Sequence, residues 1–153
     1  ALTHTRCDPA MIELEITESM LLGDANKVHE TLQQLSAMGV RLALDDFGTG
    51  YSNPAYLQNY PLDTLKIDKV FLAGQKHSML MGTILSMGKV LGLTIVAEGV
   101  ETAAQADWLI ERGCDQLQGY YYSKPLPVHD ATQYLLAKQS GALHGNDSER
   151  KAA

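Results

Sequence analysis

The sequence predicts an α/β fold in which parallel strands alternate with helices. Amphipathic helical patterns recur along the chain, and each is followed by a glycine, a short apolar strand and a group of polar residues. This alternation is typical of βαβ units, whose strands run parallel. The polar groups come after the strands, which is where barrels and open sheets of α/β proteins build their sites.

The first βα unit has clear local signals. A strand is expected over residues 11–18. The following helix begins after Asp24, a favourable N-cap, and its apolar residues recur at three- and four-residue steps. Gly39 can adopt the left-handed conformation that ends a helix. The next strand, residues 41–44, leads into a polar turn that begins with two aspartates.

The rest of the chain repeats this pattern. Further strands are expected over residues 63–68, 93–97 and 114–117, with helices over 79–91 and 103–112. The total is about five βα units, whereas a closed eight-stranded barrel takes about 250 residues. We therefore expect the later part of a larger barrel, with Glu15 on an uncovered edge strand. A five-stranded open sheet that is complete in itself is the alternative.

Composition limits the classes of protein that fit. The chain has 153 residues, a formal net charge of −6 and 45% hydrophobic residues, which argues against a disordered chain. No apolar run reaches the roughly 20 residues that span a bilayer. The acidic balance argues against binding to a nucleic acid polymer, but not against a nucleotide enzyme that recruits cations. Cys7 and Cys114 lack the CxxC spacing, and a cytoplasmic location is expected.

Acidic residues gather where the predicted strands end. Converging carboxylates repel one another, so such a site needs cations. Oxygen ligands without clustered Cys or His favour Mg²⁺ or Mn²⁺ over zinc. Two neighbouring carboxylates at a strand-to-loop turn can hold two metal ions about 3.5–4 Å apart for displacement at phosphorus. The acids in question are Glu15, Glu18, Asp45, Asp46, Glu98 and Glu101.

A lysine on the third strand is the candidate partner of these acids. Lys66 and Asp68 lie two residues apart, so both are expected to point into the barrel mouth. Lys66 could orient an attacking water or neutralise developing charge, and its structural alternative is an ion pair with Asp68. Glu98 could act as a base or as a metal ligand.

Purely structural roles stay open for several of these acids. Glu18 and Asp68 could tie loops together, and Glu101 could be a solvated residue before a helix capped by Thr102. Glu13, which alternates with Glu15, is interpreted as structural.

Five short motifs together resemble the EAL-domain family of bacterial cyclic di-GMP phosphodiesterases, in order and in spacing. The resemblance extends to about Lys138 and implies a TIM-barrel-like fold of the (β/α)8 type. Residues 1–140 would then be the C-terminal part of the domain, and residues 141–153 a disordered tail. The motifs are LEITES (14–19), DDFGTGYS (45–52), LKID (65–68), VAEGVET (96–102) and QGY (118–120).

The resemblance implies a role for each matched residue. Glu15, Asp45 and Asp46 match metal ligands. Lys66 matches the residue that holds the nucleophilic water, and Glu98 matches a general base or metal ligand. The implied reaction is Mg²⁺- or Mn²⁺-dependent hydrolysis of cyclic di-GMP to pGpG with two ions. The other matches are Glu18, which steadies the loop after Asp46, and the active-site residues Asp68, Glu101 and Gln118.

The sequence also departs from the family pattern. The Glu-Ala-Leu motif and a metal-binding asparagine of the next strand are absent. We therefore expect the 153-residue chain to be inactive or weak, although its parent domain is expected to be active. The expected partners are cyclic di-GMP, a second copy in a homodimer, or tethered sensory or cyclase domains.

Two other functions stay open. A non-catalytic module that binds cyclic di-GMP or a partner protein is the main alternative. An unrelated metal-dependent barrel enzyme, such as an aldolase or enolase-like lyase, fits the acids but not the motif order.

Overall fold

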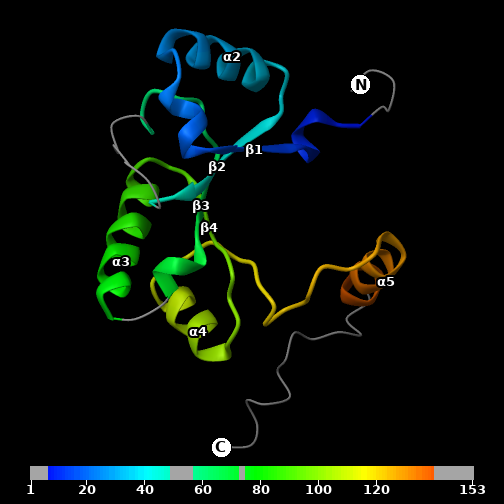
Figure 1. The fold of residues 1–153 in the computed structure, drawn as a ribbon. Coiled ribbons are helices and arrows are strands. Elements are labelled where there is room, and N and C mark those ends of the chain that lie inside the picture. The colour runs from blue at the N-terminus through cyan, green and yellow to red at the C-terminus, as the bar shows by residue number, and fades with distance from the viewer. Residues whose placement is uncertain (1–6, 49–56, 73–74, 140–153) are drawn as a thin grey trace, which may run out of the picture.

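A computed structural model describes residues 7–48, 57–72 and 75–139 of the chain (Figure 1). Its centre is a five-stranded parallel sheet in which the strands lie side by side in chain order. Doubly wound sheets reverse their strand order, whereas a barrel segment keeps one direction. The strands are β1 (Glu13–Thr17), β2 (Arg41–Phe47), β3 (Thr64–Ile67), β4 (Thr94–Ala97) and β5 (Gln116–Leu117). This confirms the predicted α/β fold with about five βα units.

Helices connect the strands, and their ends follow the expected signals. The Asp24 side chain accepts hydrogen bonds from two backbone N–H groups at the start of α2, and Gly39 follows that helix with a φ of 83°. Thr102 and Gln105 form a capping box at the start of α4. The α-helices are α2 (Ala25–Ala37), α3 (Gln75–Val90), α4 (Ala103–Glu111) and α5 (Val128–Gln139), with short 3-10 turns η1 (Pro9–Met11), η2 (Glu18–Leu22) and η4 (Lys69–Leu72).

Several boundaries differ from the sequence-based expectation. Helix α3 begins four residues early, because its first turn is polar and carries no apolar signal. Strand β1 is shorter than residues 11–18, since η1 and η2 occupy its predicted ends. Strand β2 continues past residue 44 to Phe47. The tail predicted over 141–153, and the glycine-motif residues 49–52, lie outside the described residues.

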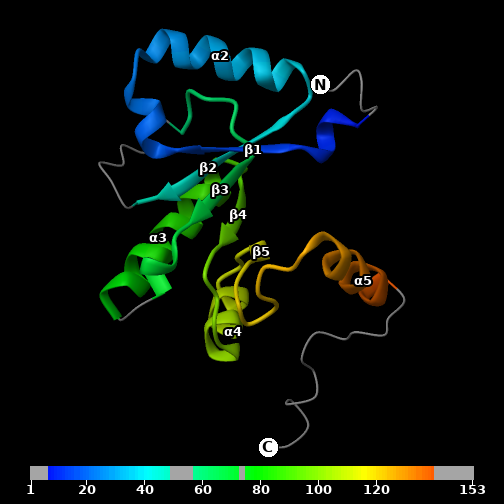
Figure 2. The same ribbon diagram turned by 45° about the vertical axis from the view of Figure 1, so that its right-hand side comes forward.

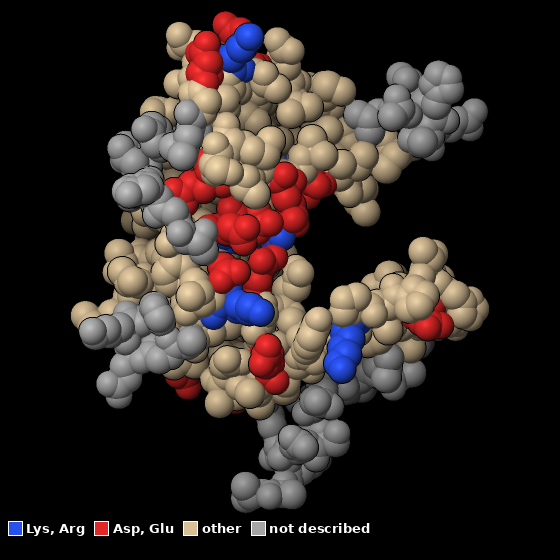
Figure 3. All heavy atoms as spheres, in the orientation of Figure 1, with Lys and Arg blue, Asp and Glu red and all other residues tan. Residues whose placement is uncertain are grey.

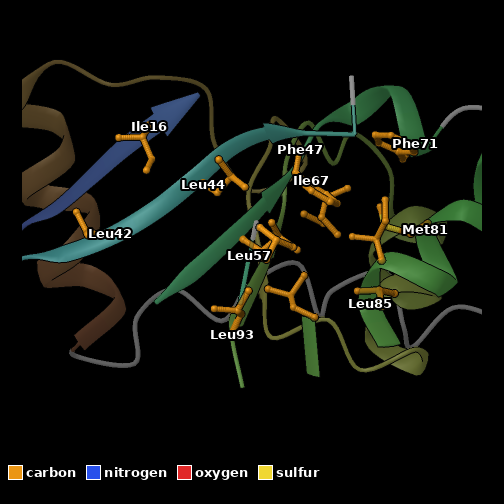
Figure 4. Close-up of a cluster of buried hydrophobic side chains, with 14 of the residues drawn as sticks. Ile16, Leu42, Leu44, Phe47, Leu57, Ile67, Phe71, Met81, Leu85 and Leu93 are labelled. Carbon is orange, nitrogen blue, oxygen red and sulfur yellow. The ribbon is translucent and has the colours of Figure 1, made fainter. Parts of the chain in front are cut away.

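The outward face of the sheet forms the hydrophobic core. Strand side chains such as Leu44, Leu65 and Ile95 are at most 1% exposed, and they join one cluster with Met81 of α3 and Leu109 of α4 (Figure 4). Burying a side chain of this size contributes about 1.5–3 kcal/mol. The core therefore fixes the strands, and with them the positions of the polar side chains on the opposite face.

The margins of the fold are more open. Strand β1 is an edge strand with a mostly exposed burial pattern, as expected for the strand that carries Glu15. Helix α5 stands away from the sheet in two views and has no buried residue (Figures 1 and 2). No helix in the described ranges is both long enough and apolar enough to span a membrane.

Candidate active site

Lys66 is the centre of the candidate site. Its Nζ lies 2.5 Å from Glu15 Oε1, 2.7 Å from Glu98 Oε1 and 3.5 Å from Asp45 Oδ1. Lys66 is only 5% exposed, yet three carboxylates from three different strands or strand ends reach it. Figure 3 shows acidic side chains gathered in the middle of this face of the molecule. The predicted convergence of these four residues is therefore observed.

The ammonium and its acidic neighbours stabilise each other electrostatically. Burial by itself lowers the pKa of Lys66, but the hydrogen bonds to Glu15 and Glu98 and the charges of Glu98 and Asp45 outweigh burial. The net effect raises the pKa of Lys66 above its ordinary value, so this side chain stays protonated at physiological pH. The sequence offered Asp68 as its structural partner. This was wrong for the described residues, where the ion pairs of Lys66 go to the three acids above.

Asp45 and Asp46 both face this cluster because the strand is irregular there. Adjacent residues of a regular strand point to opposite faces. The pairing of β2 with β3 shifts between Leu44 and Phe47, and Asp46 has a φ of 55°. Among the described residues it is the one non-glycine residue with positive φ, a conformation often found at functional sites. The pair thus lies within β2 rather than after it, which corrects the predicted strand end.

The acidic residues are close enough to share a cation. Asp45, Asp46 and Glu98 each offer a carboxylate oxygen, and these oxygens lie within 4.8 Å of one another. All are hard donors suited to Mg²⁺, Mn²⁺ or Ca²⁺. Three carboxylates contact the ammonium of Lys66, and Asp46 lies beside two of them, so the excess negative charge favours divalent ions.

A pocket of about 320 Å³ adjoins the cluster through Glu98. Asp68, Glu101 and Gln118, three of the residues matched by the motifs, line this pocket together. Sequence reasoning missed Lys69, which also lines it and follows Asp68 directly. Tyr120, the last residue of the QGY motif, is 62% exposed and also lines the pocket.

Three of the predicted site residues also have clear structural contacts. Glu18 Oε2 accepts a hydrogen bond from the Gly48 backbone N–H at 3.4 Å, which connects η2 to the end of β2. Asp68 Oδ1 accepts one from the Val70 N–H at 2.8 Å. The Glu101 N–H donates to Gln105 Oε1 at 2.8 Å, next to the start of α4.

Comparison with known proteins identifies the family. The family model of the EAL domain matches residues 1–125. The chain belongs to the EAL-domain family. This EAL domain is 44% identical over 132 residues to the bifunctional diguanylate cyclase/cyclic di-GMP phosphodiesterase MucR from Pseudomonas aeruginosa, a match that covers 84% of the chain.

Solved structures agree with this assignment. The EAL domain superimposes on the MucR phosphodiesterase in complex with c-di-GMP with a TM-score of 0.81, at 41% identity over 85% of the chain and 54% of that structure. It also matches Klebsiella pneumoniae BlrP1 in a manganese/c-di-GMP complex, with a TM-score of 0.75, 30% identity, and coverage of 81% of the chain and 33% of that structure. The chain spans about a fifth of the length of the curated relatives it matches.

Proposed function

We propose that this EAL domain is a metal-dependent phosphodiesterase that hydrolyses one phosphodiester of cyclic di-GMP to linear pGpG. The observation that carries the proposal is the convergence of Glu15, Asp45 and Glu98 on the buried Lys66. Two further facts support it: the named activity of the relative MucR and the c-di-GMP complexes of similar structures.

The donor set supports a binuclear Mg²⁺ or Mn²⁺ site. Asp45 and Asp46 are adjacent and present their carboxylates at the same rim, with Glu98 close to both. We assign Glu15, Asp45 and Asp46 as metal ligands. Divalent ions bound there would polarise the phosphoryl oxygens and make water a better nucleophile.

Lys66 and Glu98 are the proposed catalytic residues. Lys66 is proposed to act as a hydrogen-bond donor, because the acids that contact it raise its pKa and favour the ammonium form. It would orient the attacking water and stabilise negative charge on the phosphoryl group. Glu98 is proposed to accept the proton of that water, a role supported by its contact with Lys66 and by its position in the pocket lining. The water oxygen bonds to phosphorus as the bond from phosphorus to one ribose oxygen breaks, and that ribose oxygen takes up a proton to become a free hydroxyl of pGpG.

The pocket beside the cluster is the proposed binding site for the nucleotide. Asp68, Glu101 and Gln118 would hold the substrate there, as their side chains line one cavity. Glu18 is proposed to steady the end of β2 through its contact with Gly48. We place this activity in the cytoplasm, and the proposed protein partners are a second copy or a tethered sensory or cyclase domain.

The test is an assay of the protein in its cellular length with cyclic di-GMP and Mn²⁺, with pGpG resolved by chromatography. We expect pGpG from the unchanged protein and its loss in Asp45→Asn. The control is Glu30→Gln, which removes an exposed carboxylate from α2, remote in sequence from every motif. Tight nucleotide binding without product would contradict the enzyme and support a binding module. Turnover that survives Asp45→Asn would contradict the assigned site.

A further inference from the structure

A second set of polar contacts lies next to the Lys66 cluster on the same face of the sheet. The Thr64 hydroxyl donates to Glu13 Oε2 at 2.6 Å and accepts from Arg41 Nη2 at 3.3 Å. Arg41 Nε also lies 3.6 Å from Glu13 Oε2. Thr64 is 1% exposed, so its hydroxyl depends on these partners. We call Glu13, Arg41 and Thr64 the lower layer.

The lower layer has a fixed register relationship to the candidate site. Glu13 lies two residues before Glu15 on β1, and Thr64 lies two residues before Lys66 on β3, so each pair shares a face. Strand β2 runs between β1 and β3, which are therefore about 10 Å apart. Ala43 of β2 pairs with both Glu15 and Thr64, and its methyl group leaves room above β2. Two side-chain bridges thus cross β2: Glu13 to Thr64, and Glu15 to Lys66.

The Glu13–Thr64 bridge helps to hold β1 in the position that the Glu15–Lys66 bridge requires. Among the described strands β1 pairs with β2 alone, and the Glu15 side chain is 50% exposed, so side-chain contacts across β2 help to hold it toward Lys66. The Thr64 hydroxyl donates to a charged acceptor, and such hydrogen bonds are stronger than those between neutral groups. The Arg41–Glu13 ion pair is partly exposed on both sides, so it contributes less, and it joins β1 to β2 rather than to β3. The Thr64–Glu13 hydrogen bond is thus a second tie between β1 and β3 on this face, beside the Glu15–Lys66 ion pair.

We propose that Glu13 and Thr64 are positioning residues of the metal site, which act by holding Glu15 within reach of Lys66 and of the bound cations. This inference rests on the proposed function. The contact resembles the outer hydrogen bonds that orient metal ligands, whose loss commonly costs about 10–100-fold in metal affinity or activity. The sequence pattern assigned Glu13 to structure alone.

The test compares three substitutions in the protein in its cellular length. Thr64→Val removes the hydroxyl at constant shape, and Thr64→Ser keeps it. The matched control is Thr94→Val, because Thr94 is the register partner of Thr64 on β4. Three quantities are measured for each variant. Mn²⁺ affinity is measured by electron paramagnetic resonance, and kcat and KM are measured with cyclic di-GMP as substrate. The free energy of unfolding is measured in urea.

We expect Thr64→Val to weaken Mn²⁺ binding by about tenfold and to lower kcat similarly with little change in KM. For Thr64→Ser and Thr94→Val, the Mn²⁺ affinity and kcat should each stay within about twofold of the values for the unchanged protein. If Thr64→Val does not fold, Glu13→Gln is the second variant, because Glu13 is partly exposed. We expect Glu13→Gln to lower Mn²⁺ affinity and kcat by a smaller factor than Thr64→Val.

Two results would overturn the inference, and they are distinguishable. If the unchanged protein binds Mn²⁺ and makes pGpG, and Thr64→Val loses only stability, then Thr64 is structural and the proposed function stands. If the unchanged protein neither binds Mn²⁺ nor makes pGpG, the proposed function fails and the inference fails with it.

Discussion

Glu15 and Lys66 form an ion pair across a strand that lies between them. Glu15 Oε1 is 2.5 Å from Lys66 Nζ, although β1 and β3 each pair with β2 and not with each other. Ala43 of β2 pairs with Glu15 of β1 and with Thr64 of β3, two residues before Lys66, and is completely buried. The small size of this one residue therefore allows an acid of the edge strand to reach the centre of the site.

Ala43→Leu should separate this pair. A larger side chain would fill the space over β2, and overpacking of a buried position costs about 1–3 kcal/mol. We expect lower stability in urea and weaker Mn²⁺ binding, while Ala43→Gly should lose about 1 kcal/mol of stability but keep Mn²⁺ binding. Wild-type Mn²⁺ affinity in Ala43→Leu would show that the crossing is not needed.

Lys66→Met should make stability depend on divalent cations. Without the ammonium, Glu15, Asp45 and Glu98 repel one another. We therefore expect the free energy of unfolding, measured in urea with EDTA present, to fall by about 1–3 kcal/mol. Mn²⁺ should restore part of this loss, whereas the exposed control Lys27→Met should respond to neither reagent. Turnover should fall by about 100- to 1000-fold. Cation-independent stability in Lys66→Met would argue against strong repulsion among the acids.

Asp46→Asn and Asp46→Ala should separate charge from backbone strain. Asn tolerates the left-handed conformation seen at this position, whereas Ala does not, so only Asp46→Ala should lose about 1 kcal/mol of stability or more. Both variants should lose Mn²⁺ affinity, because both remove a carboxylate. Equal stability of the two variants, compared by urea unfolding, would contradict the role of the strained backbone.

Gly119→Ala and Gly82→Ala should have opposite effects on stability. A Cβ at Gly119 would collide with the backbone of Val100, which cannot move aside easily, so we expect a loss of about 2 kcal/mol or more. Val100 and Gln118 share a backbone hydrogen bond, so the collision should also weaken binding of cyclic di-GMP. Gly82 lies in α3 with open space around it, and its replacement should stabilise by about 0.5–1 kcal/mol. Thermal and urea unfolding of both variants would decide this.

Local signals account for much of what could be predicted. Asp24, Gly39 and Thr102 act at helix ends within a few residues of their own positions, so α2 and α4 were predictable from the sequence. The alternation of strand and helix patterns predicted parallel units, and the parallel strand pairing confirms them. Strand ends were less certain, because the extension of β2 to Phe47 depends on pairing with β3 rather than on its own residues.

The sequence by itself determined the family, and its motif order and spacing named the acids and Lys66 as candidates for the chemistry. Only the tertiary structure decided how they meet: which acids pair with Lys66, how the β2 irregularity turns Asp45 and Asp46 to one rim, and why Glu13 and Thr64 belong beside the site. The reason is physical. Hydrophobic periodicity acts along a few residues of chain, whereas contacts across strands depend on register and on the size of the residue between them.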